Sequence, residues 1–142
     1  MMARALGIDH GDARIGLAVS DELGMLAHAL ETIHLREVAD PIARIAEIVA
    51  RDKIGQIVLG LPRNMDGTYG PASEKVRAFA EKLKAATPCP VKLWDERLTS
   101  VAAQRSLHEA GRTVKNSREV IDQVAAQMIL QGWLDAQAML QG

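Results

Sequence analysis

The chain opens on the stretch Ala-Arg-Ala-Leu-Gly-Ile-Asp (residues 3–9), followed after four residues by Arg-Ile-Gly-Leu-Ala-Val-Ser (residues 14–20). Both stretches are mainly aliphatic, and the intervening His-Gly-Asp-Ala is typical of a turn, so we expect the two strands of a hairpin. A weaker alternation of apolar and polar residues over 28–35 predicts a third strand. The fold is therefore expected to begin with an antiparallel meander.

After residue 40 the hydrophobic period changes to that of a helix. Asp40 and Pro41 form a typical helix start, and apolar residues recur on one face of the segment that they open (Ile42, Ile45, Ala46 and Val49). The apolar run 56–61 predicts a strand buried on both faces, and the residues over 60–73 predict a long loop of the kind that is often functional. A second helix with a similar apolar face (Val76, Phe79, Ala80 and Leu83) and a strand over 91–94 follow.

Two further helices are expected to complete the chain. Thr99 or Ser100 can cap the first, which would end at Gly111, and Asn116 with Glu119 resembles a capping box for the second, running to about Gln137. The resulting order β-β-β-α-β-α-β-α-α predicts an α/β fold in which a five-stranded mixed sheet is flanked by helices.

Length and composition predict one domain over 1–142, because 142 residues suit a single core. A hydrophobic fraction of 48% and a charged fraction of 25% exclude disordered, collagen-like and fibrous classes. No apolar run approaches the roughly 20 residues of a membrane span, and no signal-peptide core precedes Asp9. The single Cys89 cannot form an internal disulfide. We therefore expect a cytoplasmic protein with no membrane partner.

The net charge of −1, from 17 basic and 18 acidic residues, does not by itself indicate a nucleic-acid-binding protein. Its distribution is uneven, however. Between residues 97 and 118, five basic residues (Arg97, Arg105, Arg112, Lys115 and Arg118) stand against Glu109 alone, which gives this window a net charge of +4. Such a window can be a solvated face or a docking surface for a polyanion.

Acidic residues occupy three places where the predicted elements give a carboxylate no structural role. Asp9 ends one predicted strand and Asp95-Glu96 ends another, and functional groups of α/β sheets gather at the carboxyl ends of strands. Asp122 lies on the last predicted helix, where it extends an apolar stripe (Ala125, Ala126, Ile129 and Trp133). A carboxylate on that packed side is costly unless it is paired or binds a cation.

Three convergent carboxylates without a Cys or His cluster suit Mg²⁺ or Mn²⁺, which take oxygen ligands and leave room for substrate phosphates. Metal-assisted hydrolysis of a phosphodiester is the matching reaction. Two alternatives stay open at this point. Asp122 can instead be an ordinary helix-boundary residue, and His10 can act as a proton shuttle or simply shape its turn.

Four segments together form a specific pattern that covers nearly the whole chain. They are residues 7–11 (Gly-Ile-Asp-His-Gly) with 14–21, residues 60–68 (Gly-Leu-Pro-Arg-Asn-Met-Asp-Gly-Thr), residues 94–100 (Trp-Asp-Glu-Arg-Leu-Thr-Ser), and Asp122 with the residues that follow it (Ala125, Ala126, Ile129, Leu130 and Gln131). The pattern resembles the YqgF/RuvX family of bacterial pre-16S rRNA nucleases, also described as Holliday-junction-resolvase-like proteins. The resemblance implies an RNase H-like fold.

By this resemblance Asp9, Glu96 and Asp122 would be the catalytic, metal-binding acids. Arg14 and Arg97 match arginines of the family and are expected to contact phosphate, although Ala13 stands where the family often has a basic residue.

Three further residues complete the expected substrate contacts. Arg63 stands where the family often has an apolar residue, so it can contact the nucleic-acid backbone at the loop mouth or be solvated. Asn64, in the same loop motif, and Lys115, in the basic window, are the other two.

The function that the resemblance implies is that of a metal-dependent endonuclease in the processing of the 16S rRNA precursor, and hence in ribosome biogenesis. Its expected partners are precursor rRNA and the pre-ribosomal particle, with the protein a monomer or homodimer. Resolution of branched DNA, and a weakly catalytic nucleic-acid-binding module, are the alternatives. Actin-like kinases also carry a Gly-Ile-Asp strand, but they need two related domains, for which this chain has no room.

Overall fold

The first three strands form the predicted meander in the computed structural model, which describes residues 3–64, 66–98 and 117–141. Strand β1 (Arg4–His10) pairs antiparallel with β2 (Arg14–Ser20), and β2 pairs antiparallel with β3 (Ala27–His34). The turn between β1 and β2 is closed by a hydrogen bond from the Gly11 amide to the Arg14 carbonyl, 2.9 Å long. The hairpin prediction is therefore confirmed.

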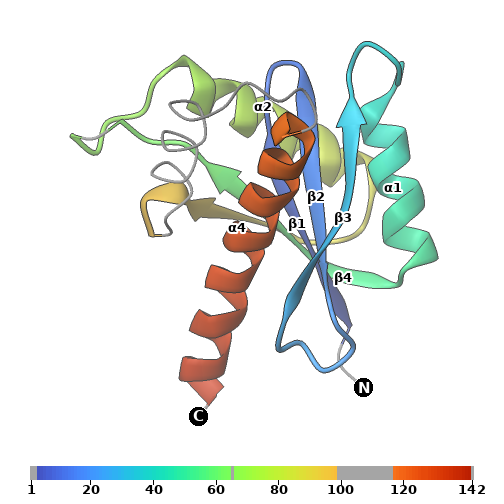
Figure 1. Ribbon diagram of the computed structural model, residues 1–142, viewed down its shortest axis with the longest axis vertical. Helices are drawn as coiled ribbons and strands as arrows, with labels where there is room; N and C mark the ends of the chain where they lie inside the picture. Colours follow the sequence, from blue (N-terminus) through green and yellow to red (C-terminus); the bar gives the residue numbers. More distant parts are fainter. Residues whose placement is uncertain (1–2, 65, 99–116, 142) are drawn as a thin grey trace.

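Two strand–helix crossovers extend this meander into a mixed sheet (Figure 1). Helix α1 (Pro41–Arg51) leads to β4 (Ile54–Leu61), and α2 (Pro71–Ala86) leads to β5 (Val91–Asp95), both of them strands in parallel pairings. The strand order is β3-β2-β1-β4-β5. A 3₁₀ turn η1 (Glu96–Leu98) follows, and α4 (Ser117–Gln141) is the C-terminal helix. The predicted five-stranded mixed sheet flanked by helices is confirmed.

The starts of α1 and α2 follow local chemistry. Asp40 Oδ1 accepts a hydrogen bond of 3.0 Å from the Ala43 amide, which confirms its predicted capping role. Pro71 occupies the first turn of α2, where its fixed φ suits the helix and its missing N–H is not needed. Because β4 continues to Leu61, opposite Asp95, and α2 begins at Pro71, the loop spans 62–70, which is shorter than the predicted 60–73.

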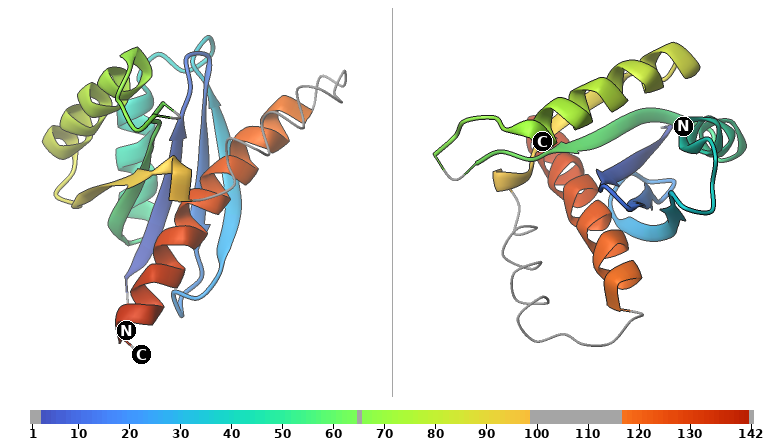
Figure 2. Two further views of the ribbon diagram at one scale, coloured as in Figure 1. Left: turned by 90° about the vertical axis from the view of Figure 1, so that its left-hand side faces the viewer. Right: turned by 90° about the horizontal axis from the view of Figure 1, so that it is seen from above.

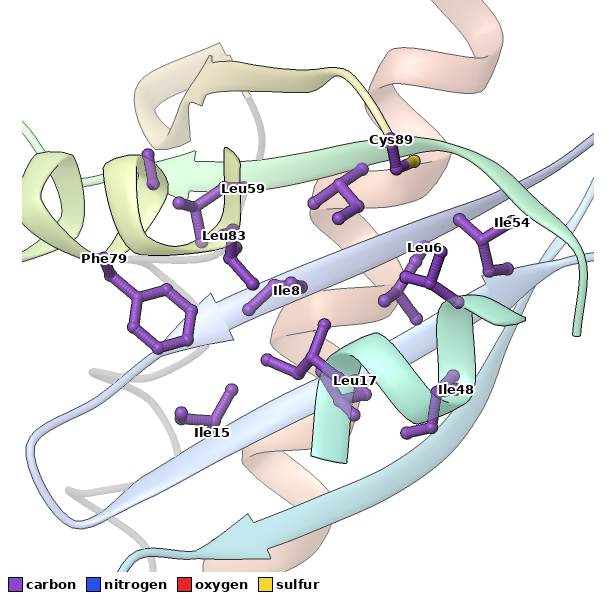
Figure 3. Packing of buried hydrophobic residues seen from close by; sticks show 14 of the residues in the cluster. Leu6, Ile8, Ile15, Leu17, Ile48, Ile54, Leu59, Phe79, Leu83 and Cys89 are labelled. Carbon is purple, nitrogen blue, oxygen red and sulfur yellow. The ribbon is translucent and has the colours of Figure 1, made fainter. Parts of the chain in front are cut away.

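Helices α1 and α2 cover one face of the sheet, and α4 covers the other (Figure 2). Figure 3 shows Phe79 and Leu83 of α2 and Ile48 of α1 pointing at the aliphatic side chains of the central strands. Cys89 is buried at the margin of this core, and burial raises the pKa of its thiol. The thiol therefore stays protonated at neutral pH, as befits a structural cysteine.

On the other face of the sheet, α4 packs against small strand side chains and, at the glycines, directly against the strand backbone. A β-carbon added to Gly7 of β1 would lie 2.7 Å from Leu130 Cβ and 2.8 Å from the Ala126 carbonyl oxygen. Ala125 and Ala126 are both buried, so small residues on the two sides allow the helix to approach the strands closely. The apolar stripe after Asp122 does face the sheet.

Three glutamines fix α4 to the edge strand β3. They stand four residues apart, on one side of the helix. Gln123 donates to Thr32 Oγ1 (3.1 Å) and Gln127 to the Ala27 carbonyl (2.9 Å). Gln131 accepts from the Ala27 amide and donates to the Met25 carbonyl, both at 2.9 Å. These bonds fix the rotation of α4 and thereby determine which of its residues face the sheet.

Some predictions lie outside the described residues. They include the helix from Thr99 or Ser100 to Gly111, the capping Asn116, and Lys115. The last helix reaches Gln141, four residues beyond the predicted end. Among the residues that are described, no helix is long and apolar enough to cross a membrane.

Candidate functional site

Asp9 lies at the centre of a row of three residues that crosses β2, β1 and β4. Gly16 is its partner on β2, and Gly60 follows Leu59, the residue that pairs with Ile8 on β4. Neighbouring strands lie about 4.8 Å apart, so Asp9 has a glycine at that spacing on each side. Side chains alternate along a strand, which puts Asp9 on the same face as Gly7, under α4. Asp9 is only 3% exposed.

The two glycines make room for the other two predicted acids. A β-carbon at Gly16 would lie 2.1 Å from the Asp122 carbonyl oxygen and 3.1 Å from Asp122 Cβ. At Gly60 it would lie 2.5 Å from Ile129 Cδ1 of α4 and 3.0 Å from Glu96 Oε1. Asp122 and Glu96 therefore flank Asp9 from opposite sides, each over a residue without a side chain. The structure brings the three acids of the sequence prediction to one edge of the sheet.

Oxygen donors of this kind match the chemistry of a hard divalent cation. Within the described part of the chain, however, no group of three or more His, Cys, Asp or Glu side chains could hold a metal ion as it stands. One of the three carboxylates already has a cationic partner, because Asp122 Oδ2 accepts a hydrogen bond from Arg14 Nε at 2.6 Å.

The Arg14–Asp122 pair is partly shielded from water, with the two side chains 28% and 15% exposed. A hydrogen bond in which both partners are charged is stronger than a neutral one, and shielding reduces its screening by salt. Arg14, predicted as a phosphate contact, therefore neutralises a predicted catalytic acid in this structure. Its guanidinium lies at the acidic edge, within reach of any anion that binds there.

His10 is the last residue of β1 and follows Asp9 directly. Its ring lies 4.5 Å from the ring of Phe79, tilted by 47°. Burial lowers the pKa of His10, and the opposing effect of the Asp12 and Asp9 carboxylates does not outweigh it. The imidazole is therefore neutral at neutral pH and held in place by α2.

The carboxylates of the adjacent residues Asp95 and Glu96 have different surroundings. Asp95 accepts hydrogen bonds from Arg63 Nη1 (3.0 Å) and Arg97 Nη2 (3.1 Å), whereas Glu96 lies over Gly60. Burial by itself would raise the pKa of Asp95, but the bonds from Arg97 and Arg63 outweigh it and hold this pKa below its ordinary value. The Arg63 side chain is therefore hydrogen-bonded within the protein rather than solvated, since it also donates to the Gly67 carbonyl at 3.1 Å.

Asn64, another predicted substrate contact, shapes the loop in this structure. Its side-chain amide donates to Thr68 Oγ1 (3.0 Å), and its backbone amide donates to the Thr68 carbonyl (2.9 Å). The sequence alone does not reveal the roles of Gly16 and Gly60, although both stand in the motifs shared with the family. Tyr69 is a further residue without a predicted role, and its signal is that the chain's only tyrosine lies in the loop that is expected to be functional.

The arrangement of sheet and helices defines the class of protein. Thermus thermophilus RuvC in complex with a Holliday junction substrate superposes with a TM-score of 0.61 at 18% identity, covering 96% of each chain. Another Thermus thermophilus RuvC structure gives 0.57 at 17% identity, with the same coverage. The fold is thus RNase H-like, as the resemblance implied.

The chain belongs to the RuvX family, whose model, described as Holliday junction resolvase, matches residues 3–136. A relative from Symbiobacterium thermophilum is 49% identical over 93% of this chain and 92% of its own length. One from Moorella thermoacetica is 51% identical, with 93% and 94% covered. Both carry the name "Putative pre-16S rRNA nuclease". The family resemblance stated from the sequence is confirmed.

Replacing Gly16 by alanine tests the close approach of α4. The new β-carbon cannot lie 2.1 Å from the Asp122 carbonyl, so the helix must shift, and overpacking of this kind costs about 1–3 kcal/mol. Urea denaturation of Gly16→Ala should show that loss. The matched control is Gly70→Ala, whose β-carbon would meet only the Asn64 amide at 3.6 Å. Equal free energies of unfolding for the two variants would contradict the packing argument.

A double-mutant cycle of Arg14→Gln and Asp122→Asn measures the shielded ion pair. We expect a coupling of about 1–2 kcal/mol in the free energy of unfolding, the range of a partly buried charged hydrogen bond. The coupling should shrink only modestly as salt is raised, because the pair is not fully exposed. Effects that add to within about 0.5 kcal/mol would show that the pair contributes nothing measurable.

His10 makes a pH-dependent contribution to stability in metal-free protein. Its folded pKa is lowered, so the unfolded chain binds more protons in the window below the ordinary histidine pKa of about 6.5. Stability should therefore be complete above that pH and fall as pH drops through it towards the folded pKa. His10→Gln should flatten the profile measured by urea denaturation in EDTA. An unchanged slope in His10→Gln would refute the assignment.

Proposed function

We propose that this protein is a divalent-metal-dependent endonuclease that hydrolyses phosphodiester bonds, with the precursor of 16S rRNA as its substrate. It would act in the cytoplasm as a single domain of residues 1–142, on the RNA or on the pre-ribosomal particle. The observation that carries the proposal is the row Gly16–Asp9–Gly60, which lets Asp122 and Glu96 flank a buried Asp9. The name of the relatives supports the substrate.

Grouping acids beneath a helix has no value for nucleic-acid binding alone. Carboxylates repel phosphates unless a cation intervenes, and burying them costs free energy. Asp9 and Glu96 are among the few charged residues that the described structure buries, at 3% and 9% exposure. Buried carboxylates at the edge where substrate would arrive are needed for metal-dependent hydrolysis but not for nucleic-acid binding alone. Their presence therefore favours a nuclease over a binding module.

Asp9, Glu96 and Asp122 would hold Mg²⁺ or Mn²⁺, since all three supply oxygen ligands of the preferred kind. Such an ion, when bound, lowers the pKa of coordinated water and stabilises charge on the phosphate. Arg14 bonds to Oδ2 of Asp122, so Oδ1 could serve as the metal ligand while other N–H groups of the guanidinium donate to a phosphate oxygen. His10, neutral and packed on Phe79, can accept a proton at the edge of the same site.

Branched DNA is the second candidate substrate. The family model is described as Holliday junction resolvase, and the RuvC structure with a TM-score of 0.61 is a complex with a Holliday junction. The same three acids would serve both substrates, because the bond that is hydrolysed is a phosphodiester in each. The choice therefore depends on how the substrate is positioned rather than on the acids.

Cleavage by wild type and Asp9→Asn tests the proposal. Both proteins are assayed on precursor 16S rRNA and on a four-way DNA junction, with Mg²⁺ or Mn²⁺. Loss of a metal ligand should reduce the rate by at least about 100-fold, the upper end of the effect of outer-shell changes. EDTA should abolish cleavage by wild type.

Asp135→Asn is the matched control, since it makes the same change on the exposed side of α4 and should leave the rate unaltered. Equal cleavage by wild type and Asp9→Asn would mean that a contaminating nuclease is responsible, and the proposal would be wrong. Cleavage of the junction alone would transfer the proposal to branched DNA. Tight nucleic-acid binding without any cleavage would favour the binding module.

A further inference from the structure

Three arginines and a tyrosine gather beside the loop 62–70. Arg63 Cζ lies 4.5 Å from the centroid of the Tyr69 ring, and Arg77 Cζ of α2 lies 4.7 Å from it. Arg97 is close by, because a β-carbon at Gly67 would lie 3.4 Å from Arg97 Nη1 and 3.6 Å from Arg63 Nη2. We call Arg63, Tyr69, Arg77 and Arg97 the arginine cluster.

Positive charge in the arginine cluster is only partly compensated. Arg63 and Arg97 share the carboxylate of Asp95, and Asp66 interacts electrostatically with Arg97 while accepting hydrogen bonds from Thr68. For Arg77, no carboxylate of the described residues lies within ion-pair distance, although Glu74 is one turn earlier on the same helix. The exposed guanidinium of Arg77 is therefore available to an anion from outside.

The Tyr69 ring lies against two of these cations, Arg63 and Arg77. A guanidinium over an aromatic ring is attracted by the ring electrons, yet two guanidiniums near one ring repel each other. That repulsion is relieved when an anion binds to both. The Tyr69 side chain is well exposed, at 48%, so the cluster is open to a large ligand. Its loop is fixed by hydrogen bonds and by Gly67, whose φ of 88° suits glycine, so the cations are preorganised.

The arginine cluster lies at the same edge of the sheet as the three acids. Asp95, which holds Arg63 and Arg97, directly precedes Glu96, and Arg63 follows Gly60 by three residues. The arginine cluster and the three acids lie on opposite faces of the sheet. Asp95 pairs with Leu61, which belongs to the core on the α2 side, whereas Glu96 lies over Gly60 on the α4 side. A nucleic-acid strand with one phosphate at Asp9 would need to continue only a short way to reach the cluster.

We propose that the arginine cluster binds the phosphate backbone of the substrate strand on the α2 side of the acids, with Arg77 as the contacting cation and Tyr69 as its positioning residue. The inference rests on the proposed function and adds to it a second point of contact. Guanidinium groups suit this task because their planar forks match phosphate oxygens. One contact at the acids and a second at the arginine cluster would together fix the register of the strand.

Binding of a fluorescein-labelled single-stranded RNA of about 20 nucleotides, followed by fluorescence anisotropy in EDTA, tests the inference without cleavage. Arg77→Gln is compared with Lys82→Gln, which removes the same charge from another exposed position of α2. Loss of one phosphate contact should lower the slope of log K against log salt by about 0.7. The affinity advantage of wild type over Arg77→Gln should then shrink about threefold between roughly 50 and 200 mM salt.

Variants of Tyr69 distinguish the effect of its aromatic ring from the effect of its size. Tyr69→Phe keeps the aromatic face and should bind as wild type does, whereas Tyr69→Leu should lose affinity as Arg77→Gln does. Thermal melting shows that each variant is folded. The same measurements on a four-way DNA junction show which nucleic acid uses the cluster, since an effect there and not on RNA would assign it to DNA.

Equal salt slopes for Arg77→Gln and Lys82→Gln on both nucleic acids would overturn the inference, and so would wild-type affinity in Tyr69→Leu. Those results leave the proposed function intact whenever wild type cleaves and Asp9→Asn does not. Failure of wild type to bind either nucleic acid would overturn the inference and the proposed function together.

Discussion

Helix α4 lies directly against the backbone of β1 and β2, and the placement of the acidic residues follows from this contact. Gly7 and Gly16 carry no side chain, and the space is filled by Leu130, Ala126 and the Asp122 backbone. Glycine within a strand loses conformational entropy on folding and adds no packing of its own. Glycine stands on two neighbouring strands because it lets α4 approach the backbone. The glutamines of α4 then fix the rotation of the helix about its axis.

The close approach of α4 to the sheet also brings charged side chains together at one edge of the sheet. The Asp122 backbone contacts β2 at Gly16, so the same geometry that buries the apolar stripe places a carboxylate beside Asp9. Arg14 compensates part of that charge from the neighbouring strand. Packing of α4 is favourable here, whereas the proximity of the two carboxylates is unfavourable. The aliphatic cores on both faces of the sheet supply the stability that offsets this repulsion.

Strand alternation divides the adjacent acids at the end of β5. Asp95 faces the loop and is saturated by Arg63 and Arg97, whereas Glu96 turns to the α4 side over Gly60. A shift of one residue in the pairing of β4 with β5 would exchange the two roles. The register of this parallel pair therefore decides which carboxylate belongs with Asp9 and which organises the cations of the loop.

The amino-acid pattern alone predicted the meander, the start of α1 at Pro41 and the position of Asp9 at a strand end, because period, capping and turn chemistry are local. It also predicted three acids at one edge, although it could not say that Gly16 and Gly60 admit two of them. Tertiary structure alone decided that Arg14 meets Asp122, that Arg63 and Arg97 share Asp95, and that Arg77 meets Tyr69. These pairs join different elements, so strand register and helix placement, which only the folded chain fixes, decide them.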